Sequence, residues 1–226
     1  HLDVLAAAFA DFGEAQSGLR DGHAELGLPK ENDPTVLAAL DRVDALWRGY
    51  GAAISAIAAR GDVPKQELGV LAEMNLRVLS AANDVVKTLV GAYGGTGGTS
   101  RGAAKAIDMA GRQRMLSQKM VKEVALMALD YRRSETRQAL RATVELFDQS
   151  LLDLLYGDPL AGIPAPPARV AEKLSEVEAI WADSAPILRD IAEGGAADEF
   201  DVEAVVLNRD ELLRTSNEAV FLYENA

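Results

Sequence analysis

Apolar side chains recur every three or four residues over most of this chain, the spacing that gathers them on one face of an α-helix. The pattern predicts helices at about residues 2–20, 34–60, 64–93, 102–132, 134–156, 167–193 and 200–224. The segments between them are rich in glycine, proline and asparagine, which favour turns and end helices. We therefore expect an all-α protein.

Three of the intervening segments are marked most clearly. ELGLPKENDP (25–34) reads as a loop, with Asp33 as the N-cap of the next helix and Pro34 at its first position. GDPLAGIPAPP (157–167) contains too many prolines to be helical. GGTGGTS (94–100) reads as a flexible linker between the two halves of the chain.

The two halves resemble each other. LDRVDALW (40–47) matches LSEVEAIW (174–181), and SAANDVV (80–86) resembles RTSNEAV (214–220). Five anchors keep one register, at an offset of between 133 and 135 residues. They are Phe12, Gly22, Trp47, Asn75 and Asn83, which recur as Phe147, Gly157, Trp181, Asn208 and Asn217. This self-similarity predicts a duplication.

The duplication is incomplete, because the second copy has four predicted helices and the first has three. We expect tandem antiparallel four-helix-bundle repeats over residues 1–94 and 95–226. The first lacks the counterpart of helix 102–132, which an offset of about 134 residues would place before His1. A three-helix remnant would expose an apolar stripe. We therefore expect an upstream helix or an oligomer to complete the first repeat.

Composition excludes several classes of function. The formal net charge is −12, which does not suit phosphate binding, so we expect no nucleic-acid partner. No stretch approaches about 18 uninterrupted apolar residues, so we expect no membrane segment in this chain. The N-terminus lacks the basic region of a signal peptide, and any targeting signal or anchor is expected to lie outside the chain.

The chain also lacks the usual residues of catalytic and metal sites. It has no cysteine and only two histidines, His1 and His23. No nucleophile–base pair is discernible, so we expect no enzyme, no catalytic residues, no cofactor and no metal site. Carboxylate pairs such as Glu172/Glu176 are expected to be solvated. GGTGGTSRG (94–102) lacks the Gly-Lys-Ser/Thr ending of a phosphate loop.

One predicted helix departs from the acidic background. Residues 101–122 contain six cationic side chains and one acidic side chain, Asp108, a local charge of +5. A helical wheel places Arg114 in an apolar stripe with Ile107, Ala110, Gly111, Ser117, Gln118, Val121, Ala125 and Ala128. It places Lys105, Arg112, Lys119 and Glu123 on the opposite, solvent-facing side. Arg114 is thus expected in the middle of the buried face.

A buried guanidinium needs a counter-charge. One interpretation is an internal salt bridge to a carboxylate such as Asp153 or Glu218. The other is an external anion, held by the planar donor fork of Arg114. Gly111 costs about 1 kcal/mol relative to alanine within a helix, which indicates that something approaches closely there. The residues alone leave both interpretations open.

The motif AGRQRMLSQKM (110–120) resembles a known family signature. Residues 110–119 match, almost letter for letter, the signature of the PilJ-type sensor domain, the type IV pili methyl-accepting chemotaxis transducer N-terminal family. That family is related to the four-helix sensor domains of bacterial nitrate/nitrite receptor kinases. The resemblance implies a periplasmic, non-enzymatic helical bundle that senses a small oxyanion such as nitrate or nitrite.

The resemblance also implies a site. In the nitrate-sensing relatives, two copies of the motif helix sandwich one nitrate at a dimer interface. Carried onto this sequence, the ligand-binding residues are Arg114 and Gly111, with Arg112, Ser117 and Gln118 as secondary candidates. Such a site needs a homodimer or an upstream motif helix. The alternative function is a structural or protein-interaction bundle without a small ligand, in which Arg114 is paired internally.

Overall fold

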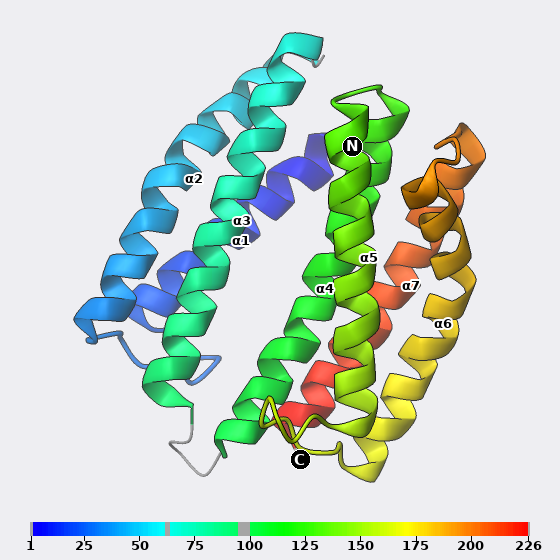
Figure 1. Ribbon diagram of the computed structural model, residues 1–226. Coiled ribbons are helices and arrows are strands. Elements are labelled where there is room, and N and C mark those ends of the chain that lie inside the picture. Colours follow the sequence, from blue (N-terminus) through cyan, green and yellow to red (C-terminus); the bar gives the residue numbers. More distant parts are fainter. Residues whose placement is uncertain (1, 62–63, 95–99, 226) are drawn as a thin grey trace. The chain divides into compact units, whose positions relative to one another are not determined.

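The computed structural model describes residues 2–61, 64–94 and 100–225. These residues form α-helices joined by short connections, which confirms the all-α prediction. The helices are α1 (Leu2–Asp21), α2 (Pro34–Arg60), α3 (Lys65–Tyr93), α4 (Arg101–Ala128), α5 (Arg133–Tyr156), α6 (Ala168–Glu193) and α7 (Glu199–Glu224) (Figure 1).

All but one of the helix ends lie within one residue of the predicted positions. Asp33 caps α2 as predicted, because its side chain accepts hydrogen bonds from the backbone N–H groups of Thr35 and Val36. Pro34 is the first helical residue of α2. The helix ends at Gly61, which adopts the left-handed conformation with φ 78°. Local capping chemistry therefore sets these boundaries.

The exception is the end of α4, which was predicted at residue 132 and lies at Ala128. Asp130 and Arg132 adopt positive φ values of 57° and 40°, so the chain turns sharply before α5 begins at Arg133. No glycine or proline marks this turn, and the sequence therefore contains no local signal for it. Residues 95–99 of the predicted linker lie outside the described residues.

The chain divides into two compact units, residues 1–93 and 94–226. In the second unit, α4, α5, α6 and α7 run alternately up and down (Figure 1). Both α4 and α6 pack against α5 and α7. All four helices contribute to one continuous apolar core, which includes Leu116, Met120, Phe147, Leu154, Leu174, Leu188 and Leu212. This unit is a four-helix bundle.

The first unit has three described helices and a smaller core. Helix α2 packs against α1 and α3, whereas α1 and α3 make no close backbone contact among the described residues. Its buried apolar cluster consists of Val36, Ala39, Leu40, Val43 and Val85. Phe12, Leu19, Ala81 and Leu89 pack on this cluster but are only partly buried. Much apolar surface of α1 and α3 therefore remains accessible.

The two units share an aromatic pair and a loop. Phe12 stacks on Trp47 with ring centroids 3.9 Å apart, and Phe147 packs on Trp181 at 4.2 Å. The α1–α2 and α5–α6 loops each form one isolated antiparallel bridge; the bridged pairs are His23 with Leu28 and Asp158 with Ile163. Both loops follow a glycine with positive φ, 89° at Gly22 and 77° at Gly157. These features recur at the offset that the sequence comparison uses.

Candidate functional site

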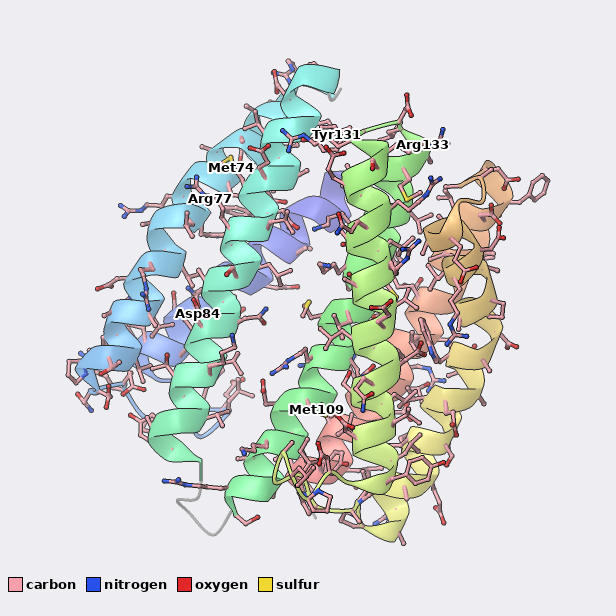
Figure 2. The ribbon with its side chains drawn as sticks, viewed as in Figure 1. Met74, Arg77, Asp84, Met109, Tyr131 and Arg133 are labelled. Atoms are coloured by element: carbon pink, nitrogen blue, oxygen red, sulfur yellow. The ribbon has the colours of Figure 1, made fainter. Side chains whose placement is uncertain are left out.

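Helix α4 carries the AGRQRMLSQKM motif and begins at a cap, because Ser100 Oγ accepts a hydrogen bond from the backbone N–H of Ala103. Its buried residues are Ala106, Ala110, Gln113, Leu116, Ser117, Met120, Glu123, Val124 and Met127. Met120 and Met127 belong to the core, and Met109, labelled on α4 in Figure 2, packs at its edge. The buried side of the motif therefore holds α4 in the bundle.

The expectation that Arg114 lies in the middle of the buried face is wrong. Gln113 is only 2% exposed, whereas Arg114, about 100° further around the helix, is half-buried at the edge of that face. Gln113 is retained inside by hydrogen bonds to α5, since its Nε2 donates to Ser150 Oγ at 2.6 Å and to the Phe147 carbonyl oxygen at 3.3 Å. A hydropathy wheel does not anticipate a buried glutamine.

The expected solvent-facing position of Glu123 is also wrong, because this side chain is only 3% exposed. The Lys119 ammonium lies 2.7 Å from its carboxylate, and Lys119 also donates to Thr143 Oγ1 of α5. Burial lowers the pKa of neighbouring Lys122, and the Glu123 carboxylate opposes that shift. The Lys119–Glu123 ion pair is thus formed within α4 and contacts α5 through Thr143, where the helical wheel predicted a solvent-exposed face.

Arg114 reaches across to α7. Its Nη1 donates to Asn217 Oδ1 at 2.7 Å, an uncharged partner. Among the described residues, no carboxylate forms an ion pair with Arg114. Of the five guanidinium N–H groups, one donates to Asn217 and no other has a partner in the part of the chain that the structure describes.

The two carboxylates considered as internal partners of Arg114 are engaged elsewhere. Glu218 lies 2.9 Å from Lys173 and 2.6 Å from Arg214, and the Lys173 ammonium lowers the pKa of this carboxyl. Asp153 accepts a hydrogen bond from Gln149 at 2.8 Å. The internal salt bridge is therefore not formed to either of them.

Two other candidates lie on the same side of α4 as Arg114. Gly111 precedes it by three residues and is half-buried, and Gln118 follows it by four and is exposed. A Cβ atom at Gly111 would meet only Arg114 Nη2, at 3.8 Å, so no described packing requires glycine there. We call this stripe the outer seam of α4; its members are Ile107, Gly111, Arg114, Gln118, Val121 and Ala125.

The remaining two candidates are not part of the outer seam. Arg112 lies about 160° around the helix from Arg114 and pairs with Asp108 at 2.7 Å. Ser117 is only 3% exposed, and its hydroxyl donates to the Arg114 carbonyl oxygen at 2.8 Å. The structure therefore brings together Gly111, Arg114 and Gln118, and leaves Arg112 and the Ser117 hydroxyl apart from them.

The cavity beside the buried side of the motif offers little room for a ligand, whereas a larger pocket of about 210 Å³ lies away from the motif, between α5 and α6. A cavity of about 10 Å³ lies between α4, α6 and α7, with Ser117, Ser184 and Arg209 among its lining residues. This volume holds about one water molecule. A nitrate ion has four heavy atoms and does not fit, so the accessible part of the motif is the outer seam.

Other predicted constellations have structural roles. Glu176 pairs with Lys173 at 2.6 Å, and Asp198 forms a capping box at the start of α7. Trp181 is a core residue whose indole N–H donates to Asp148 at 2.7 Å. Within the described ranges, no group of three or more His, Asp or Glu side chains could hold a metal ion. Nor is any described helix sufficiently long and apolar to span a membrane.

Two residues at the candidate site received no role from the sequence. Gln113 lies within it and fastens α4 to α5, and Asn217 holds the Arg114 guanidinium. The repeat comparison had already marked Asn217, as the counterpart of Asn83. Its contact with Arg114 joins positions 103 residues apart, so it depends on α4 and α7 lying side by side.

Comparison with known proteins agrees with the motif. Residues 98–204 match the PilJ family model, described as "Type IV pili methyl-accepting chemotaxis transducer N-term". The ligand-binding domain of the P. aeruginosa nitrate receptor McpN is 27% identical, over 53% of this chain and 94% of that chain, with a TM-score of 0.46. No curated protein sequence matches the chain. By this match, residues 98–204 resemble a PilJ-type sensor domain, which agrees with their helical fold.

Proposed function

We propose that the second unit captures a small oxyanion, nitrate or nitrite, on the outer seam of α4, with Arg114 as its main ligand. The observation that carries this proposal is the partner of Arg114, a neutral amide rather than a carboxylate. A guanidinium presents paired N–H donors in one plane, which match the oxygen atoms of a planar oxyanion. The cationic side chains of residues 101–122 add a local positive field.

The outer seam also supports a second helix in the site. Its members alternate spacings of four and three residues, the pattern of a coiled-coil interface. Gly111 leaves room beside the Arg114 guanidinium, since no other described atom comes within 4 Å of its Cβ position. We propose that a second motif helix, from another copy of the chain, lies against this seam and closes the site over the anion.

Anion capture would reach the rest of the bundle through α7. Asn217 occupies one N–H group of Arg114, so an anion on the remaining donors touches α4 directly and α7 through this amide. A ligand that favours one arrangement of two packed helices shifts their equilibrium. We propose that the relative position of α4 and α7 carries the signal, in a periplasmic sensor.

We also propose that the first unit is a second PilJ-like repeat. The shared aromatic pair and the shared loop support this proposal, because both lie at equivalent places in the two units. Residues 1–93 contain no AGRQRM sequence, so the arginine site proposed here belongs to the second unit.

Calorimetric titration of nitrate and nitrite into the whole chain tests the anion site. Arg114→Ala should weaken binding by at least about tenfold, the usual loss for a hydrogen bond to a charged group. Arg114→Lys keeps the positive charge but loses the planar pair of N–H donors, so its affinity should lie between those of wild type and Arg114→Ala. Arg112→Ala is the matched control, because Arg112 pairs with Asp108 away from the seam, and should stay within about threefold.

Three results would contradict the proposal. Equal binding by wild type and Arg114→Ala would remove Arg114 from the site. Equal losses in Arg112→Ala and Arg114→Ala would indicate a diffuse charge effect rather than a site. Absence of nitrate and nitrite binding would favour the protein-interaction bundle as the function of this unit.

A further inference from the structure

The second unit contains one helix that joins two others. Helices α5 and α7 make no close backbone contact with each other among the described residues, and α4 packs against both. Gln113 is fastened to Ser150 of α5, and Arg114 to Asn217 of α7. Helix α4 therefore covers one face of α5 and one face of α7.

Among the described residues, the first unit has counterparts of these two faces and no helix that packs against both of them except α2. By the repeat register, α1 corresponds to α5 and α3 corresponds to α7. Asn83 of α3 corresponds to Asn217, and Val86 corresponds to Val220, one turn further along. Val220 is only 6% exposed, whereas Val86 is 40% exposed. Val86 is thus accessible where its counterpart on α7 is covered; Asp84, two residues before it on α3, is labelled in Figure 2.

The corresponding face of α1 is also accessible. Phe12 is half-buried, although its counterpart Phe147 is fully buried. Ala15 is exposed at the position where Ser150 accepts the hydrogen bond from Gln113. Phe12 of α1 and Val86 and Asn83 of α3 thus correspond to residues on the faces that α4 covers in the second unit, and we call these two faces of α1 and α3 the open face.

We propose that the open face binds an amphipathic helix with the chemistry of α4, a cationic helix whose arginine reaches Asn83. The second unit, in which α4 covers α5 and α7, indicates that this partner is a helix. The acidic composition of α1 indicates that the partner helix is cationic. Helix α1 contains one cationic and four acidic side chains, and its only cation, Arg20, pairs with Asp41 and Asp44. Helix α4 contains six cationic and two acidic side chains. Opposite charges favour such an encounter.

Within the described residues, the Asn83 amide forms no hydrogen bond. It is therefore available to accept one from an arginine, as Asn217 does from Arg114. Ala15 replaces Ser150, so a glutamine at the position of Gln113 in the partner helix has no hydroxyl acceptor on α1. The open face should therefore depend more on the arginine of its partner helix than on the glutamine. This inference involves no anion, so its test is independent of the test of the proposed nitrate site.

A synthetic peptide of residues 101–128 is the probe, added to the whole chain. We expect saturable binding, with slower hydrogen exchange in α1 and α3 and no change in α5 and α7. Val86→Asp should weaken binding by at least about tenfold, because it places a charge under the helix. Leu76→Asp is the matched control, since its counterpart Asp210 is exposed in the second unit, and should bind within about threefold of wild type.

A double-mutant cycle tests the polar contact. Asn83→Ala in the chain and Arg114→Ala in the peptide should each weaken binding, and the two losses should not add. Protection of α5 and α7 instead would mean that the peptide displaces α4, and would overturn the proposal. It would also be overturned by an absence of protection in α1 and α3, or by a chain dimer that covers the open face and is abolished by Val86→Asp.

Discussion

The two units show what a single helix contributes to a bundle. In the second unit, α4 lies between α5 and α7, and all four helices contribute to one core. In the first unit, the corresponding α1 and α3 have no described helix between them, and the buried cluster comes from α2 with a single residue of α3. Equivalent side chains therefore differ in burial, and a substitution repeated in both units measures that difference.

The largest difference is expected at the repeated phenylalanine. Phe147 is fully buried against Trp181, so Phe147→Ala should lower the free energy of unfolding of the second unit by about 3–5 kcal/mol. Phe12 is half-buried against Trp47, so Phe12→Ala should lower that of the first unit by at most about 2 kcal/mol.

Urea denaturation would measure both effects, with Trp47 and Trp181 as reporters of the first and second units. Each is followed alone, in Trp181→Phe and Trp47→Phe backgrounds, because the two units need not unfold together. Equal losses at the two phenylalanines would mean that the first unit is as well covered as the second. That result would also remove the basis for the open face.

A smaller effect, equal in the two units, is expected at the repeated loop glycine. A Cβ at Gly22 would lie 2.9 Å from the Leu28 carbonyl oxygen, and one at Gly157 would lie 2.8 Å from the Ala165 backbone nitrogen. Both residues have positive φ. Gly22→Ala and Gly157→Ala should each lower the free energy of unfolding of their own unit by about 1–3 kcal/mol.

The same denaturation experiment applies, with a helical glycine as the control. Gly91 of α3 has nothing within 4 Å of its Cβ position, so Gly91→Ala should leave stability unchanged or raise it by up to about 1 kcal/mol. If Gly157→Ala destabilises and Gly22→Ala does not, the two loops differ in their constraints. The loop would then no longer count as a repeated feature.

Local signals predicted most of this fold. Asp33 and Pro34 mark the start of α2 because capping chemistry lies within a few residues. The end of α4 was missed, since Asp130 and Arg132 adopt positive φ without a glycine to announce it. The turn that contains both residues is closed by hydrogen bonds such as that from the Tyr131 N–H to the Leu126 carbonyl oxygen. The spacing of apolar residues gives no sign of such a turn.

The candidate site was predictable as a helix and a set of residues, but not as a surface. Arg114 stood out by its charge within an apolar stripe. The buried face of α4 is, however, centred about one residue, or 100°, away from the face that the helical wheel assigned to the core. The rotation follows from Gln113 and Glu123, which are polar and nevertheless buried because α5 and Lys119 satisfy them. The role of Asn217 depends on a contact between two distant helices, and only the repeat hinted at it.

The smallest expected effect concerns a carboxylate that only the first unit has. Glu31 lies in the α1–α2 loop and accepts hydrogen bonds from the Tyr93 hydroxyl at 2.6 Å and from the backbone N–H groups of Asn32 and Asp33. These bonds, that from Tyr93 foremost, hold the pKa of Glu31 below its ordinary value of 4.5. The same contact raises the pKa of Tyr93 to about 12.

The sign of the pH dependence follows from these shifts. Because the pKa of Glu31 is lower in the folded chain, its stabilisation is present above the ordinary pKa of 4.5 and is lost as the pH falls below it. Glu31→Gln should therefore lower the free energy of unfolding of the first unit by about 1 kcal/mol at pH 7, with a corresponding fall in its Tm. The effect should be smaller at pH 3. Tyr93→Phe should act in the same direction, and the Trp181 signal of the second unit should not change. A Glu31→Gln effect of equal size at both pH values would mean that Glu31 acts through packing rather than charge, and that this loop is not fastened to α3 by an ionised carboxylate.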